Sequence, residues 1–102
     1  MSKLAYDGAY QVGATGNTVT SGVGSASIAI PNDSSGNRAR FVRLQATGNL
    51  YVKFGLAGVT ATNNDMLLSP DCDVIVSCKS FSTIAYIQEA VAAKLNITPL
   101  ES

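Results

Sequence analysis

Residues 41–54 read FVRLQATGNLYVKF and hold two runs in which apolar and polar side chains alternate. Such alternation is typical of β-strands that bury one face and expose the other. The runs are separated only by residues 47–49 (TGN), and glycine and asparagine tolerate the positive φ that tight turns need. We therefore predict a β-hairpin here. The side chains predicted to face inward are Val42, Leu44, Ala46, Leu50, Val52 and Phe54.

Further strand-like runs lie on both sides of this segment. Residues 25–30 alternate until Pro31, which cannot donate a hydrogen bond to a sheet, and residues 32–37 (NDSSGN) are a cluster of turn formers. Short strands closed by turn residues in this way predict a β-sandwich or a barrel. Residues 72–78 alternate as well, and one face of that run would carry Cys72, Val74, Val76 and Cys78.

Residues 83–98 fit two periods. Apolar residues recur there at helical spacing from Ile84 to Leu95, but residues 91–98 also alternate as in a strand. We favour two strands, because β-branched and aromatic residues dominate both ends and the rest of the chain is β. A short helix near the C-terminus is the alternative. The expected organisation is an N-terminal arm at residues 1–8, a single β domain at residues 9–98 and a C-terminal tail at residues 99–102.

The chain has 102 residues, of which 46% are hydrophobic and only 14% charged, and its seven basic side chains balance seven acidic ones. That length fits one domain, and the composition is the reverse of that of disordered chains. Sparse charge has two explanations: a surface coated with uncharged polar residues, or a surface largely covered by partners. Arg38, Arg40 and Arg43 are the closest basic group. A solvated strand edge explains them better than a phosphate-binding patch, so we expect no nucleic-acid partner.

Neither a secretory signal nor a membrane span is expected. No apolar stretch follows Lys3, and the longest apolar runs are too short to cross a bilayer, so we expect synthesis in a cytoplasm and no membrane partner. Cys72 and Cys78 would lie about 20 Å apart in one extended strand, which is too far for a disulfide. We expect both to be small buried hydrophobic residues, with an interchain bond or a metal site as the alternative.

The chain lacks the residues that most catalytic sites need. It has no histidine, so the usual general base and the commonest metal ligand are missing. A serine nucleophile with a lysine base would need Ser80 and Lys79 to face each other, but neighbours in a strand point to opposite faces. Asp71 and Asp73 are too few for a calcium loop, and no glycine motif of a phosphate loop occurs. We expect no enzymatic activity, no cofactor and no metal. The aromatic residues fit core packing, with a stacking platform for bases or sugars as the alternative.

Three segments resemble a known group of proteins: residues 4–13 (LAYDGAYQVG), residues 39–55 and residues 84–100. Together they are similar to small virion proteins of tailed bacteriophages, encoded among head and tail structural genes. The resemblance covers most of the chain and lies in strand patterning, not in a catalytic motif, so no functional residue can be carried over. It implies an all-β fold: a single-domain antiparallel β-sandwich of jelly-roll-like type.

The resemblance also implies a role. It predicts a capsid decoration or cement protein, located in the virion, which binds the major capsid protein or other virion proteins and forms a dimer or trimer. A tail- or fibre-associated module that binds a receptor or a glycan is the alternative, and a host-directed accessory protein is a third class. The residues expected at partner interfaces are Leu4, Tyr6, Tyr10, Phe41, Tyr51 and Ile75.

Overall fold

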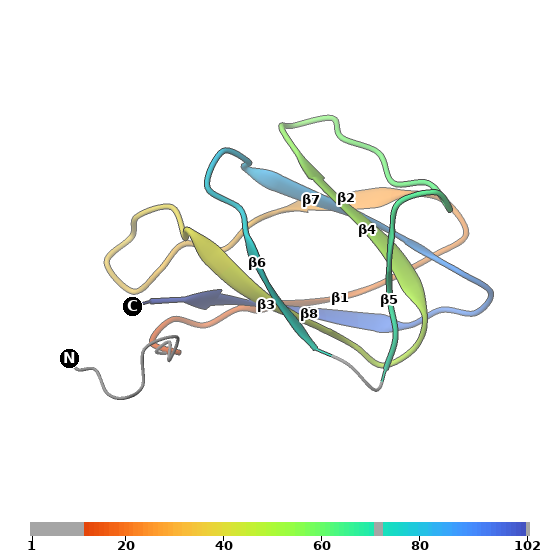
Figure 1. The fold of residues 1–102 in the computed structure, drawn as a ribbon, viewed down its shortest axis with the longest axis horizontal. Coiled ribbons are helices and arrows are strands. Elements are labelled where there is room, and N and C mark those ends of the chain that lie inside the picture. The colour runs from red at the N-terminus through yellow and green to blue at the C-terminus, as the bar shows by residue number, and fades with distance from the viewer. Residues whose placement is uncertain (1–11, 71–72, 102) are drawn as a thin grey trace.

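The computed structural model describes residues 12–70 and 73–101, which form eight β-strands and contain no helix. The strands form two antiparallel four-stranded sheets, in the orders β1-β8-β3-β6 and β2-β7-β4-β5 (Figure 1). The sheets pack against each other, so the predicted all-β sandwich is confirmed. The strands are β1 (Asn17–Thr20), β2 (Ala26–Ala29), β3 (Phe41–Ala46), β4 (Leu50–Gly55), β5 (Met66–Leu68), β6 (Val74–Ser77), β7 (Thr83–Gln88) and β8 (Lys94–Leu100).

The strand pairing is nested. β1 pairs with β8, β2 with β7, β3 with β6 and β4 with β5, all antiparallel, so the chain doubles back on itself as one long hairpin. The further pairs β3–β8 and β4–β7 complete the two sheets. Eight strands in this order form a jelly roll. The β2–β3, β4–β5 and β6–β7 connections consequently lie at one end of the sandwich and the other four connections at the opposite end.

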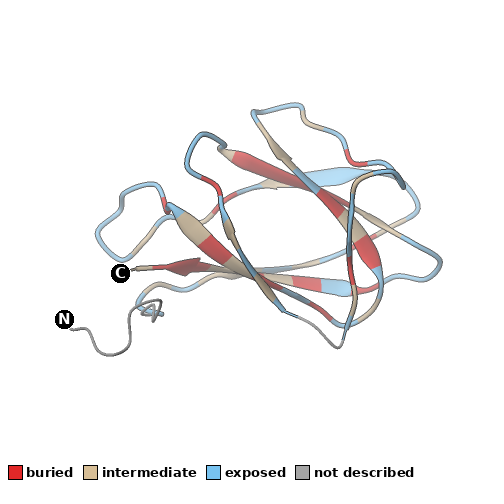
Figure 2. Cartoon of the chain, in the orientation of Figure 1, coloured by how far each residue is buried: buried red, intermediate tan, exposed pale blue. Residues whose placement is uncertain are grey.

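The inward faces of both sheets carry the buried apolar side chains. Leu44 lies opposite Ile97 in the first sheet, and Val52 lies opposite Tyr86 in the second. Figure 2 shows the buried residues concentrated on the inner strands β3, β4, β7 and β8. The inward faces predicted for residues 41–54 are confirmed, although Phe54 is only half-buried. The largest fully buried side chains are Leu44, Leu50, Ile84, Leu95, Ile97, Val42, Val52, Pro99 and Cys78.

Residues 47–49 do not form the predicted hairpin. β3 belongs to one sheet and β4 to the other, so these residues carry the chain across the sandwich. The N–H of Thr47 donates to the carbonyl of Lys94 (2.9 Å), at the start of β8, and not across a turn of its own. Gly48 has no positive φ, and a Cβ there would lie 3.1 Å from the Cβ of Ala93. The glycine therefore permits close approach of the β3–β4 and β7–β8 connections, and it does not serve a tight hairpin turn with positive φ.

Residues 83–98 form β7 and β8, so two strands are confirmed and the alternative of a helix is wrong. β8 continues through Pro99 to Leu100, and both are buried, so the chain leaves the sheet later than the predicted tail at residues 99–102. A proline is tolerated there because β1 pairs only as far as Ile97, and beyond that point β8 has a neighbour on one side only.

Candidate functional site

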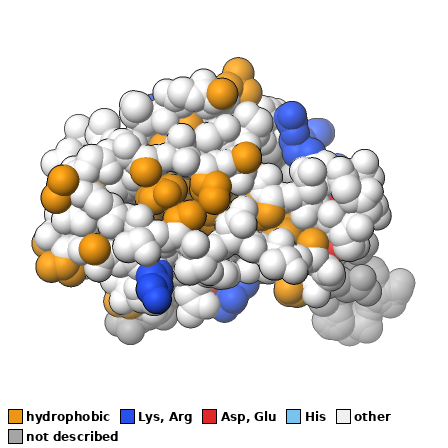
Figure 3. Space-filling model, turned by 180° about the vertical axis from the view of Figure 1, so that it is seen from behind, with side chains coloured by type: hydrophobic (Ala, Val, Ile, Leu, Met, Phe, Trp, Pro, Cys, Tyr) orange, Lys and Arg blue, Asp and Glu red, His pale blue; other side chains and the backbone are white. Residues whose placement is uncertain are grey.

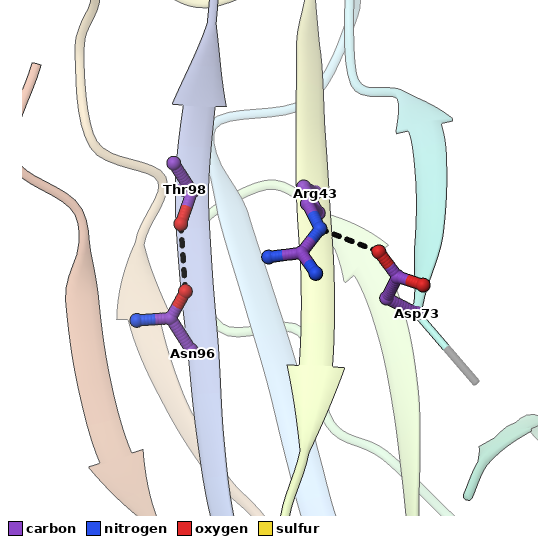
Figure 4. Close-up of polar contacts among 4 residues, drawn as sticks. All are labelled: Arg43, Asp73, Asn96 and Thr98. Atoms are coloured by element: carbon purple, nitrogen blue, oxygen red, sulfur yellow. Dashed lines mark hydrogen bonds and ion pairs between the residues drawn. The ribbon is translucent and has the colours of Figure 1, made fainter. Parts of the chain in front are cut away.

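A row of polar side chains crosses the outer face of the β1-β8-β3-β6 sheet. We call Thr18, Arg43, Asp73, Asn96 and Thr98 the polar row; Figure 4 shows all but Thr18. The Thr98 hydroxyl donates to Oδ1 of Asn96 (2.6 Å), and Nδ2 of Asn96 donates to the hydroxyl of Thr18 on β1 (3.0 Å). Arg43 lies opposite Thr98 in the register and binds Asp73, which immediately precedes β6. The outward face of this sheet thus presents oriented donors and acceptors.

The ion pair at one side of the polar row is open to water. Nε of Arg43 donates a hydrogen bond to Oδ2 of Asp73, and this bond, together with the guanidinium charge, holds the pKa of the Asp73 carboxyl below its ordinary value. The two side chains keep 38% and 46% of their surface exposed. An ion pair this exposed orients its side chains but adds little to stability.

A hollow of about 370 Å³ opens where β3 begins and β8 ends. Its walls come from the β2–β3 connection, the first residues of β3 and the end of β8, and polar side chains dominate them. This position lies at one end of the sheet that carries the polar row. We call it the end hollow; its lining residues are Asp33, Ser35, Asn37, Arg38, Arg40, Phe41, Leu100 and Glu101.

The turn formers of the β2–β3 connection fix one wall of the end hollow. Oδ1 of Asp33 accepts hydrogen bonds from the backbone N–H groups of Ser35 (3.0 Å) and Asn37 (2.9 Å), the local bonding that aspartate favours in turns. Gly36 adopts a φ of 81°, in the left-handed region that glycine tolerates. The segment that the sequence marked only as a loop therefore has a defined internal structure.

The C-terminal end of the described chain ties this wall to the sheet. Both oxygens of the Glu101 carboxylate are bound by Ser34: Oε2 accepts its N–H (3.0 Å) and Oε1 accepts its hydroxyl (2.7 Å). A Cβ at Gly13 would lie 2.7 Å from Oε2, so glycine leaves room for the carboxylate. Arg38 and Arg40, in contrast, make no ion pair with any residue of ranges 12–70 and 73–101. Two guanidinium groups thus line the end hollow without a carboxylate partner from the described chain.

A second hollow, of about 210 Å³, lies on the same sheet toward its opposite end. It is lined by residues of three adjacent strands and by the β3–β4 connection. Because Thr18 and Asn96 belong to both features, the polar row continues directly into this second hollow. Its lining residues are Thr18, Gln45, Ala46, Thr47, Lys94 and Asn96.

Of the residues predicted at partner interfaces, the three that the structure describes do not form one cluster. Phe41 lines the end hollow, and Ile75 lies on the same outer face, on edge strand β6, with 51% of its surface exposed. Tyr51 lies on the outer face of the other sheet, opposite Ile87 and Leu67. The expected contacts Leu4, Tyr6 and Tyr10 fall outside the described residues.

The outer face of the β2-β7-β4-β5 sheet is covered in part by its own chain. The β4–β5 connection crosses to the far edge of the sheet, where the N–H of Ala61 donates to the hydroxyl of Ser25 (2.8 Å). Figure 1 shows this connection running from the end of β4 towards the start of β2. Ala85, which points outward in β7, has no exposed surface.

Seen from behind, the molecule shows a group of hydrophobic side chains at its centre with few charged ones around them (Figure 3). β1 and β2 form the edge opposite β5 and β6, and each spans only four residues. Val19 of β1 and Ile28 of β2 pack on the core but are only partly buried. Short strands at this edge leave apolar surface accessible to a partner.

Comparisons with known proteins do not assign the chain to a family. No protein-family model matches it. Searches of curated proteins and of solved structures also gave no significant match. Any functional assignment therefore depends on the sequence and on the geometry of the described residues.

The cysteines, metal ligands and membrane spans considered from the sequence can also be compared with the structure. Cys78 is fully buried, its Sγ donates to the carbonyl of Ala39 (3.3 Å), and burial raises the pKa of its thiol. It is the small buried residue that the sequence predicts; Cys72 lies outside the described residues. Within residues 12–70 and 73–101 no three His, Cys, Asp or Glu side chains gather as metal ligands. The same residues contain no helix that is long and apolar enough to cross a bilayer.

The sequence did not single out the end hollow. The sequence pattern predicts that Arg38 and Arg40 are solvated residues of a strand edge. The hollow depends on Glu101, which binds Ser34 from 67 positions away. A local signal existed in the two arginines that directly follow a turn-forming loop. What the sequence lacked was the strand pairing that brings β8 alongside β3.

Proposed function

We propose that this protein is a non-enzymatic structural protein of a tailed-phage virion, acting as a capsid decoration or cement protein. The observation that carries the proposal is the jelly-roll topology, an architecture found in viral capsid and lectin domains. A fold alone does not determine a function. The resemblance of residues 4–13, 39–55 and 84–100 to phage virion proteins favours the capsid role over the lectin role.

The edges of the two sheets support a role in assembly. β5 and β6 are edge strands on the same side of the sandwich, and each presents backbone groups to which a neighbouring chain could pair. Both also expose apolar side chains: Met66 is 42% exposed, Leu67 49% and Ile75 51%. A capsid protein packed along this side would bury apolar surface and extend the sheets at once.

Quantitative mass spectrometry of purified particles tests the location. A decoration protein is expected at a copy number equal to, or a simple fraction of, that of the major capsid protein. A copy number far below that would place the chain in the neck, tail or fibre, and its absence from particles would refute the virion role.

Substitutions on the edge strands test the contact surface. Leu67→Asp and Ile75→Asp together are expected to lower the amount of protein bound to particles by about tenfold or more, because buried apolar anchors dominate interfaces. Val23→Asp is the matched control, since Val23 is 89% exposed in the β1–β2 connection, away from these edges. Circular dichroism of the free proteins should be unchanged. Equal loss with all variants would contradict the proposed surface.

Recognition of a glycan or receptor is the second candidate function. One observation favours it: the outer face of the β1-β8-β3-β6 sheet combines a polar row with two hollows, which an assembly role alone does not require.

A further inference from the structure

We propose that the end hollow is a binding site for an acidic sugar, with Arg38 and Arg40 holding the carboxylate of the sugar. The inference rests on the second candidate function, glycan recognition, and does not depend on the capsid role. It names a ligand class, a site and the contribution of each lining group.

The two arginines supply the anion-binding part. Each guanidinium carries five N–H donors in a planar fork that matches the two oxygens of a carboxylate. Arg38 and Arg40 are separated by one residue at the end of the β2–β3 connection, just before β3. Both line the end hollow, and neither forms an ion pair within the described ranges. An anion that enters the hollow therefore meets donors whose charge no neighbouring carboxylate already neutralises by direct contact.

The acids of the hollow distinguish a sugar from a simple anion. Glu101 has both carboxylate oxygens occupied by Ser34, so it acts as part of the wall. Oδ1 of Asp33 accepts hydrogen bonds from two backbone N–H groups, while Oδ2 receives no hydrogen bond from any described residue. A free carboxylate oxygen repels phosphate, which offers mainly acceptors, but accepts the hydroxyl groups of a sugar. Ser35 and Asn37 line the same hollow and add further groups that bond hydroxyls.

The remaining walls and the size fit one or two sugar rings. Phe41 and Leu100 lie opposite each other in the β3–β8 register and give the hollow an apolar side, against which the C–H face of a sugar can pack. The volume of about 370 Å³ is near the lower end of the range of about 300–1,000 Å³ typical of ligand sites. The turn around Asp33 and the tie to Glu101 hold the site in one shape before binding, which reduces the entropy cost.

Nuclear magnetic resonance of the ¹⁵N-labelled chain tests the site. Trigalacturonic acid and 3′-sialyllactose are the acidic probes, maltotriose and lactose are their neutral counterparts, and inorganic phosphate is the anion control. We expect at least one acidic probe to shift the amide signals of Ser35, Asn37, Arg38 and Phe41, and we expect the neutral sugars and phosphate not to shift them. Equal shifts with a neutral counterpart or with phosphate would overturn the proposal.

Charge-matched variants test the role of the arginines. Arg38→Gln with Arg40→Gln is expected to weaken binding of the acidic probe by about tenfold or more, because hydrogen bonds to charged groups are the strong ones. Lys53→Gln with Lys79→Gln changes the net charge equally, and both lysines lie outside the end hollow and the second hollow. This control is expected to bind as the parent chain does. A similar loss in both double variants would show that overall charge, not this site, attracts the probe.

A conservative variant guards against a folding artefact. Arg38→Lys keeps the charge but loses the planar fork, so we expect a partial loss of binding with an otherwise unchanged amide spectrum. Full binding by Arg38→Lys and by the Gln variants would refute the assigned role. Shifts confined to the second hollow, at Thr18 and Asn96, would keep glycan recognition but reject this site. No shift with any sugar would reject both the site and the second candidate function.

Discussion

Replacing Ser21 with alanine removes a hydroxyl that accepts a hydrogen bond from a buried backbone N–H. Oγ of Ser21 accepts the N–H of Ala93 (2.8 Å), and Ser21 and Ala93 are only 4% and 5% exposed. Thr47 makes almost the same bond one residue further on, where its hydroxyl accepts the N–H of Lys94 (2.8 Å), but at an exposed position. In Ser21→Ala the freed N–H stays away from water, which costs about 1–3 kcal/mol.

Thr47→Val is the matched control, since it keeps the branched shape and removes only the hydroxyl. Water can bond the exposed N–H of Lys94, so we expect a change within about 0.5 kcal/mol. Urea unfolding followed by circular dichroism measures both, and each kcal/mol corresponds to roughly 4–8 °C in Tm for a domain of this size. Equal losses in the two variants, or a loss in Ser21→Ala no larger than that of Thr47→Val, would refute the argument from burial.

Three further predictions concern packing and the thiol. Leu44→Ala should lower the free energy of unfolding by roughly 2–5 kcal/mol in urea denaturation, whereas Ile75→Ala, at an exposed position, should stay within about 0.5 kcal/mol; a large loss at Ile75 would argue for a structural role. Gly16→Ala would place a Cβ 2.1 Å from a backbone carbonyl of β8 and should cost about 1–3 kcal/mol, while Gly24→Ala, with open space around it, should change little on thermal unfolding. Cys78 has a thiol pKa raised by burial, so in a variant whose other cysteine is serine it should react with a thiol reagent only as the protein unfolds. The unfolded thiol ionises first as pH rises through its ordinary pKa, so the urea midpoint should fall from pH 8 to pH 10; reaction at the rate of a free thiol in native protein would contradict this.

The direction of side chains along each strand could be predicted from the sequence because it is a local property. A period of two places Val42 and Leu44 inward and Arg43 outward whatever the strand pairs with, and the structure confirms it. The choice of two strands for residues 83–98 also rested on local composition, and it is confirmed as well.

Strand partners could not be predicted, because pairing is decided by distant segments. Residues 47–49 have the letters of a hairpin turn, yet inward residues on both sides of them serve the core equally well if the chain crosses to the facing sheet. The cross-sheet path also lets Thr47 bind Lys94. The end hollow could not be predicted for the same reason. Its walls meet only when β8 lies beside β3, and no short motif predicts that pairing.

The nested pairing of strands affects how quickly the native state can be reached. Thr18 bonds Asn96, 78 positions further along the chain, whereas β4 and β5 are joined by one connection. Closing a long loop costs entropy before its contacts can compensate, so domains dominated by distant pairs fold slowly. The β4–β5 pair can therefore form early, whereas the β1–β8 pair can form only after the two ends of the described chain have been brought together. Until then the backbone of β1 has no partner within this fold, and these four residues can pair with another molecule.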